Sequence, residues 1–86
     1  MKKLEKNLKA LANANRLKIL QYIKNNKSGS VSDISTVVKC HYKTTSKHLA
    51  ILFQVDVLDR EQSGNEMIYS LADKLDEATI AVLKLI

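Results

Sequence analysis

The chain has 86 residues, enough for one domain, and its 45% hydrophobic and 27% charged composition is typical of a soluble globular protein rather than a disordered one. No apolar run approaches the roughly 18 residues that a membrane span needs. The N-terminus also lacks the apolar stretch of a signal peptide, so we expect a cytoplasmic protein with no membrane contact. The single cysteine, Cys40, excludes an internal disulfide and fits a reducing compartment.

Positive charge is concentrated in the first part of the chain. Residues 1–48 hold eleven Lys or Arg against two acidic residues, a net charge of +9, whereas residues 49–86 carry −4. A concentrated positive field attracts polyanions such as nucleic acids. Charge alone does not distinguish nucleic-acid binding from the alternative that the lysines are only solvated surface residues.

The first two helices follow from the spacing of apolar residues. Leu4, Leu8 and Leu11 predict an amphipathic helix over residues 3–12. The Asn-Ala-Asn segment at 13–15 can end that helix and cap the next, because Asn is a good N-cap residue. The second helix is predicted over residues 14–25, and we expect the polar cluster that closes with Gly29 to end it.

A helix-turn-helix unit is predicted next. Ser30 and Asp33 have the spacing of a capping box and open a short third helix, whose inward-facing residues are expected to be Ile34, Val37 and Val38. A fourth helix is predicted over residues 42–55, with anchoring residues Leu49, Leu52 and Val55. Only three or four residues join the two helices, which is helix-turn-helix spacing.

The pattern then changes to short strands. Residues 57–61 and 66–71 are predicted to pair as a hairpin around a four-residue turn that contains Gly64. The last apolar residues repeat at intervals of four and three and predict a helical seam: Leu71, Leu75, Ala78, Val82 and Leu85. The expected fold is mostly α, a single winged helix-turn-helix domain over residues 1–86, with five helices and a two-stranded antiparallel wing.

The fourth helix has the residue distribution of a DNA recognition helix, because its first half is polar and its second half is apolar. The candidate DNA-binding residues of this helix are Tyr42, Lys43, Thr44, Thr45, Ser46, Lys47 and His48. Hydroxyl groups can reach phosphates or base edges, and Lys can reach guanine acceptors. We expect Arg60 and Asn65 of the wing, and Lys or Arg of the first two helices, to add contacts, while Glu61 and Glu66 oppose them.

Four segments resemble the ArsR/SmtB family of winged-helix repressors: Ala10–Leu20, Val31–Ile34, Thr44–Leu52 and Ile68–Leu71. The similarity runs over most of residues 8–72. It implies a homodimer with the first and last helices in the interface, binding to palindromic operators, and repression relieved by an effector, often a metal ion. The expected interface residues are Leu4, Leu8, Leu11, Leu75, Ala78, Val82 and Leu85.

The chain departs from the metal-sensing members of that family. The start of the third helix has no Cys-x-Cys motif, and residues 73–86 contain Asp73, Asp76 and Glu77 but no His. His41 and His48 are seven residues apart, roughly 10 Å along a helix, too far for one zinc with ligands at about 2 Å. We therefore expect no metal and no cofactor.

Three single positions also depart from the family pattern. Asp56 stands where the family usually has Gly, so a left-handed backbone is expected there. His41 stands where a Ser cap is common. Cys40 replaces an apolar residue and is expected to be a small buried hydrophobe, with a redox or metal switch as the alternative.

No catalytic constellation is visible, because Ser46 and His48 do not face each other on a helix and no third group orients them. We expect a homodimeric transcriptional regulator, a repressor that binds double-stranded DNA at an inverted repeat and whose effector the sequence does not identify. Two alternatives stay open: a winged-helix protein-interaction module without operator recognition, and a redox-responsive regulator that uses Cys40.

Overall fold

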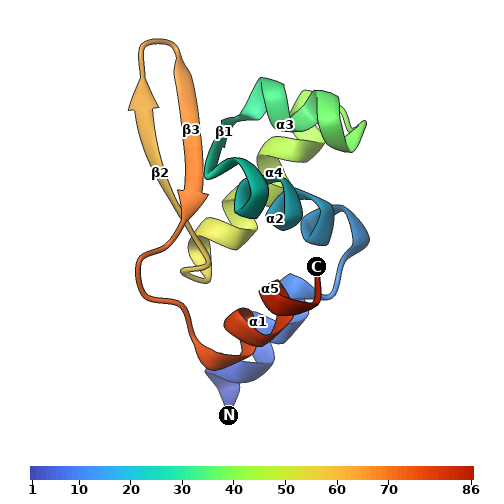
Figure 1. The fold of residues 1–86 in the computed structure, drawn as a ribbon, viewed down its shortest axis with the longest axis vertical. Coiled ribbons are helices and arrows are strands. Elements are labelled where there is room, and N and C mark those ends of the chain that lie inside the picture. Colours follow the sequence, from blue (N-terminus) through green and yellow to red (C-terminus); the bar gives the residue numbers. More distant parts are fainter.

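The computed structural model describes residues 1–86 and contains five helices and three strands (Figure 1). Their order is α1 (Lys2–Leu11), α2 (Ala14–Asn26), β1 (Ser28–Ser30), α3 (Val31–Val38), α4 (Tyr42–Gln54), β2 (Leu58–Ser63), β3 (Glu66–Leu71) and α5 (Glu77–Leu85). The predicted helix-turn-helix followed by a hairpin is confirmed, with three residues between α3 and α4. None of the helices combines the length and apolarity needed to cross a bilayer.

Side-chain caps set the starts of α2 and α3. The Asn13 side chain accepts a hydrogen bond of 3.1 Å from the Arg16 backbone N–H, and the Ser30 hydroxyl accepts one of 3.1 Å from the Asp33 N–H. These bonds satisfy N–H groups that have no partner within the helix. Both caps are the ones that the sequence predicts.

Helix α2 ends inside the polar cluster that was predicted to end it. Lys27, with φ of 73°, makes the reversal. Gly29 lies in β1, where a Cβ atom would come within 2.7 Å of Tyr22 Cε1 and 3.1 Å of Ile34 Cγ1. Glycine is therefore favoured at this position, because the Tyr22 ring packs closely against the backbone. A left-handed backbone at Asp56, with φ of 62°, is confirmed.

The wing belongs to a three-stranded antiparallel sheet of order β1-β3-β2. The prediction of two strands missed β1, because its Ser-Gly-Ser sequence has no alternation of apolar and polar residues. The turn has two residues rather than four, since Ser63 still pairs with Glu66. Gly64 has φ of 61°, and Asn65 has no positive φ, which is the pattern of a type II′ hairpin turn.

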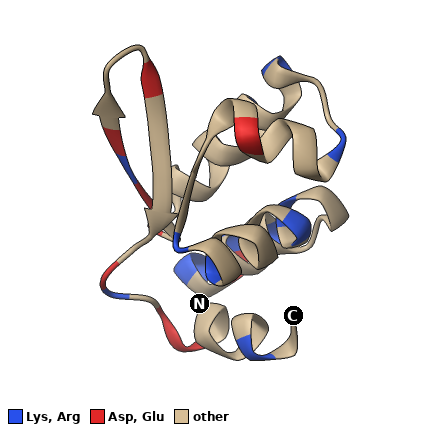
Figure 2. Ribbon diagram, turned by 45° about the horizontal axis from the view of Figure 1, so that its top comes forward, with Lys and Arg blue, Asp and Glu red and all other residues tan.

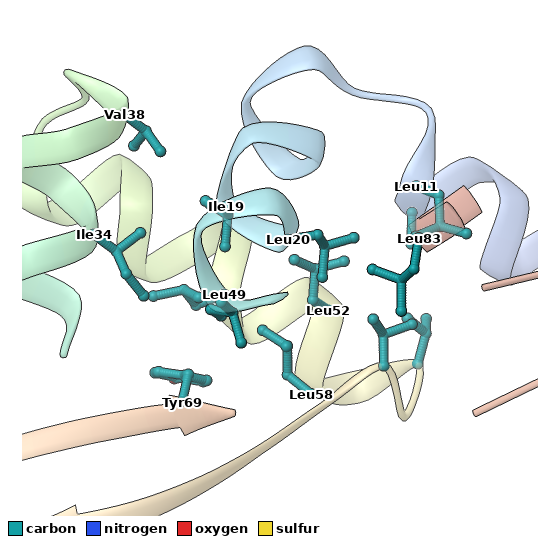
Figure 3. Close-up of a cluster of buried hydrophobic side chains, with 14 of the residues drawn as sticks. Leu11, Ile19, Leu20, Ile34, Val38, Leu49, Leu52, Leu58, Tyr69 and Leu83 are labelled. Atoms are coloured by element: carbon teal, nitrogen blue, oxygen red, sulfur yellow. The ribbon is translucent and has the colours of Figure 1, made fainter. Parts of the chain in front are cut away.

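The hydrophobic core lies where α2, α3 and α4 meet the base of the hairpin (Figure 3). The close-up shows Ile19 and Leu20 of α2, Ile34 of α3, and Leu49 and Leu52 of α4 gathered in one cluster. Leu58, Tyr69, Val38, Leu11 and Leu83 complete its labelled members. The predicted anchors of the fourth helix are thus confirmed as buried residues.

Val37 does not join the core, although it was expected to face inward. Its side chain is 55% exposed, because Ile34 and Val38 already fill the inner face of α3 and Val37 points to the side. The prediction of inward-facing residues in α3 is therefore confirmed for Ile34 and Val38 and wrong for Val37.

The last helix is shorter than predicted. Leu71 is the last residue of β3 and Leu75 lies in the following segment, so the seam expected from residue 71 onward is not one continuous helix. Asp76 starts α5, because its Oδ1 accepts a hydrogen bond of 3.2 Å from the Thr79 N–H. Asn7 Nδ2 of α1 donates to Asp76 Oδ2 at 2.9 Å. This bond holds α1 beside α5 at one end of the molecule (Figure 1).

Candidate nucleic-acid interface

Helix α4 is divided into an exposed polar half and a buried apolar half. Tyr42 is 57% exposed at its start, and Lys43, Thr44 and Lys47 are exposed on the first two turns. Leu49, which follows them, is completely buried. The core therefore anchors the second half of the helix, while one side of the first half remains exposed.

Thr45 is an exception within the polar half. Its side chain is fully buried, and its hydroxyl has no hydrogen-bond partner in the protein. It lies four residues before Leu49 and so shares the inward face of α4. This burial argues against the predicted contact between Thr45 and DNA. Ser46 is half-buried, and the other predicted residues of the polar half reach the surface at least in part.

His48 lies against Arg16 of α2. Partial burial, and then the positive charge of Arg16, lower the pKa of His48 below its ordinary value of 6.5. His48 Nδ1 and Arg16 Nε are both buried without a hydrogen-bond partner. Both effects favour the neutral form of His48. Arg16 lies in a segment that carries the family resemblance, and the fold places it beside α4.

The two wing residues lie at different ends of the hairpin. The Arg60 guanidinium is 4.0 Å from the centre of the Phe53 ring, which places it beside the anchored half of α4. Asn65 lies in the turn at the tip and is exposed. Both are accessible, but the structure does not bring them together. Acidic residues share the hairpin with them, as Figure 2 shows.

The lysines of α4 have no acidic partner. The structure holds one salt bridge, between Lys9 and Glu5 of α1 at 3.9 Å. Lys43 and Lys47 therefore present unneutralised charge beside the exposed hydroxyls of the same helix. Lys24 differs from them, because its Nζ donates to the Leu83 and Ile86 carbonyl oxygens at 2.7 and 2.8 Å and so holds the end of α5.

An apolar surface is exposed on α1 and α5, at the opposite end of the molecule from the tip of the hairpin (Figure 1). Leu4 is 41% exposed, Leu8 45% and Leu85 83%. A shallow groove of about 350 Å³ runs along α1 and is lined by Met1, Leu4, Glu5, Leu8, Lys9 and Ala12. Ile80 of α5 is also exposed.

The other predicted interface residues are less accessible. Leu11 is buried in the core of its own subunit, which argues against a role in contacts between subunits. Leu75 and Val82 are half-buried against the same core, and Ala78 is half-buried. Sequence periodicity does not separate these residues from the exposed ones, because both kinds are apolar and recur at helical intervals.

Cys40 lies between α3 and α4, half-buried and packed against the core. Its contact with the core agrees with the expected role of a small hydrophobe, but its side chain is not fully buried. His41 precedes α4 and gives it no side-chain cap. The fold brings no group of three His, Cys, Asp or Glu side chains together.

Several known proteins similar to this chain are transcriptional regulators. No protein-family model matches the chain. The HTH-type transcriptional regulator YgaV of Escherichia coli is 27% identical over 77 residues, which cover 90% of this chain and 78% of YgaV. The structure of reduced HlyU from Vibrio cholerae has a TM-score of 0.82 and 27% identity and covers 98% of this chain and 84% of HlyU.

Two further structures extend the comparison. The transcriptional repressor PagR of Bacillus anthracis has a TM-score of 0.79 and 28% identity over 98% of this chain and 92% of PagR. Mb0332 of Mycobacterium bovis is described as a homodimeric winged helix-turn-helix DNA-binding domain and a possible ArsR-family regulator. It has a TM-score of 0.81 and 25% identity over 98% of this chain and 74% of Mb0332. The chain therefore has the winged helix-turn-helix fold that these transcriptional regulators share.

Proposed function

We propose that the chain is a homodimeric transcriptional regulator that binds double-stranded DNA, with the first half of α4 in the major groove. The polar half of α4 carries this proposal, because it is exposed, basic and free of acidic residues while its other half is held in the core. The regulators that share this fold support it. We also propose a cytoplasmic location, because a DNA-binding regulator acts where its DNA lies.

Lys43 and Lys47 supply the attraction to phosphates that brings the helix to the duplex. Tyr42 and Thr44 carry hydroxyls on the same exposed turns and offer hydrogen bonds to base edges or to the backbone. Arg60 and Asn65 extend the contact along the hairpin. Ser46 and His48 are half-buried and make the smaller contribution.

The exposed apolar surface on α1 and α5 fits a second copy of this chain. A monomer of this size gains stability by covering Leu4, Leu8 and Leu85, because exposed apolar patches favour association. Mb0332 is homodimeric, which supports the same arrangement here. A symmetric dimer presents two copies of α4 to successive major grooves, about 34 Å apart, and therefore fits an inverted repeat. Occupying such a site blocks transcription, as a repressor does.

Selection of bound duplexes from a random DNA pool tests the proposal. We expect enrichment of an inverted repeat whose half-sites are about one helical turn apart. Enrichment of no sequence would contradict operator recognition and favour a protein-interaction module with the same fold. Enrichment of a single half-site would contradict the dimeric arrangement alone.

Charge reversal on α4 then tests which surface binds. With the selected duplex, Lys47→Glu is expected to abolish binding and leave the thermal unfolding transition unchanged, because Lys47 is exposed and unpaired. Lys74→Glu makes the same charge change between β3 and α5 and is the matched control. Neutralising Lys47 with Gln should reduce the slope of log affinity against log salt by about 1.8, because the dimer brings two copies of Lys47 to the duplex. Equal losses for the Lys47→Glu and Lys74→Glu variants would show that net charge, and not α4, determines affinity.

The dimer has its own test. Leu4→Glu with Leu8→Glu is expected to give monomers in sedimentation velocity, because both side chains lie on the apolar surface of α1. Val37→Glu places one negative charge on an exposed apolar residue of α3 and should leave the dimer intact. A native chain that sediments as a monomer at all concentrations would refute the arrangement.

A further inference from the structure

A second groove lies between α2 and the end of α3, and the proposed DNA contact does not use it. Its volume is about 740 Å³, within the usual range for small-molecule sites. One wall is a face of α2. The other is formed by residues 37–40, which include the last turn of α3 and the turn that leads into α4.

The charge of the groove favours an anion. Lys18 and Lys39 line it, and no acidic side chain does. Neither lysine takes part in a salt bridge. Lys39 lies directly after the last residue of α3, so its own charge also offsets the partial negative charge at the end of that helix.

Hydrogen-bonding groups of α2 face the same space. Asn15, Gln21 and Asn25 line the groove, and their side-chain amides make no hydrogen bond within the protein. Asn26 differs, because its Nδ2 donates to the Tyr22 carbonyl oxygen at 2.9 Å. Three amides with free donors and acceptors can therefore orient a polar ligand beside the two lysines.

An apolar wall completes the groove. Tyr22 lines it, with its ring held against the backbone at Gly29. Val37 and Val38 line the other side, and Val37 exposes much of its side chain there. An exposed valine beside a fixed aromatic ring favours a ligand with a flat apolar part over a simple inorganic ion.

We propose that this groove binds a small organic anion, an acidic group attached to a flat apolar body. Lys18 and Lys39 bind the acidic group, and Tyr22 and Val37 contact the body. Because Lys39 and Cys40 belong to the turn before α4, an occupied groove restrains the segment that sets the direction of α4. This last consequence rests on the proposed DNA-binding function, and it predicts that the ligand changes DNA affinity.

Benzoate is a suitable probe, with benzamide as its neutral counterpart and acetate as its counterpart without a ring. In NMR titrations of the ¹⁵N-labelled chain, benzoate should shift the backbone N–H signals of Lys39 and Cys40 and the side-chain amides of α2 in a saturable manner. Benzamide and acetate should each bind about tenfold or more weakly, because one lacks the charge and the other the apolar contact. Equal shifts with all three compounds, or no shift at these positions, would overturn the proposal.

A pair of variants locates the site. Lys18→Gln with Lys39→Gln is expected to weaken benzoate binding about tenfold or more. Lys2→Gln with Lys3→Gln removes the same charge from α1 and should leave benzoate affinity unchanged. Equal weakening by both pairs would show that benzoate senses only net charge and would refute the site.

The link to DNA is measured separately by anisotropy with the selected duplex, with and without saturating benzoate. A change in DNA affinity that the Lys18/Lys39 variant lacks supports the coupling, and an unchanged affinity refutes it. Benzoate binding in a chain that binds no DNA would uphold the groove and reject the proposed function. DNA binding without any benzoate binding would support the proposed DNA-binding function and reject the groove as a ligand site.

Discussion

Replacing Gly29 with Ala tests the packing that joins α2, β1 and α3. A Cβ atom at this position would lie 2.7 Å from Tyr22 Cε1 and 3.1 and 3.2 Å from Ile34 Cγ1 and Cδ1. Forcing an extra methyl group into a packed site costs about 1–3 kcal/mol. The Ala side chain also restricts the unfolded chain, which offsets about 0.4–1 kcal/mol of this loss in stability. We therefore expect the free energy of unfolding to fall by about 1–2 kcal/mol.

Thermal unfolding followed by circular dichroism measures this change. For a domain of this size, the expected loss corresponds to a fall in Tm of roughly 4–16 °C. The protein concentration must be the same for both proteins, because the Tm of a dimer depends on concentration. A Gly29→Ala variant with a Tm equal to or above that of the native chain would refute the reasoning.

Two further variants separate steric crowding from a general cost of replacing glycine. Tyr22→Leu removes the Cε1 atom, so Gly29→Ala should cost less in that background, and an unchanged cost would show that the ring is not the obstacle. Gly64→Ala meets no atom within 4 Å but has φ of 61°, and its cost of about 1–2 kcal/mol comes from the left-handed backbone. Gly64→Asn should recover much of that loss, because Asn tolerates this backbone, whereas Gly29→Asn should not.

Three other perturbations have expected outcomes. Leu49→Ala, at a completely buried position of α4, should lower the free energy of unfolding by about 2–5 kcal/mol in urea denaturation, and a smaller loss would mean that the core refills the space. Lys24→Met should lower Tm and speed amide exchange in α5, because it removes both hydrogen bonds to the end of that helix, and unchanged exchange would contradict that role. The Asp76 carboxyl has a pKa below its ordinary value, chiefly through the Thr79 side chain and further through the Asn7 amide and the Thr79 backbone N–H, while partial burial opposes the shift. This group therefore adds stability above its unfolded pKa of about 3.9, and that stability is lost as pH falls through its lower folded pKa. Tm measured from pH 7 to pH 2 should show a steeper acid decline in the native chain than in Asp76→Asn, and parallel profiles would be the contrary result.

Local signals in the chain were sufficient for most of the fold. Apolar spacing predicts the helices, Asn13 and Ser30 predict two helix starts, and Gly64 predicts the hairpin turn. Each of these signals acts within a few residues, through hydrogen bonds or backbone angles that a short segment sets alone. The polar half of α4 was visible for the same reason, since its residues are neighbours in sequence.

Properties that depend on distant segments could not be predicted in this way. Thr45 is polar and was expected at the surface, yet the fold turns it inward with Leu49. Strand β1 exists because β3 offers it an edge, and Gly29 is needed because Tyr22 packs against it. The start of α5 depends on Asp76, which Asn7 contacts from the far end of the chain.

The local sequence therefore determines the order of the elements and the basic, polar character of α4, because both arise from periodicity, capping and composition. Which side chains reach the surface, which leucines remain exposed on α1 and α5, and how α2 and α3 enclose a groove were decided when the elements packed together. The physical reason is that burial depends on what lies opposite each side chain, and the chain brings those partners from far apart in sequence.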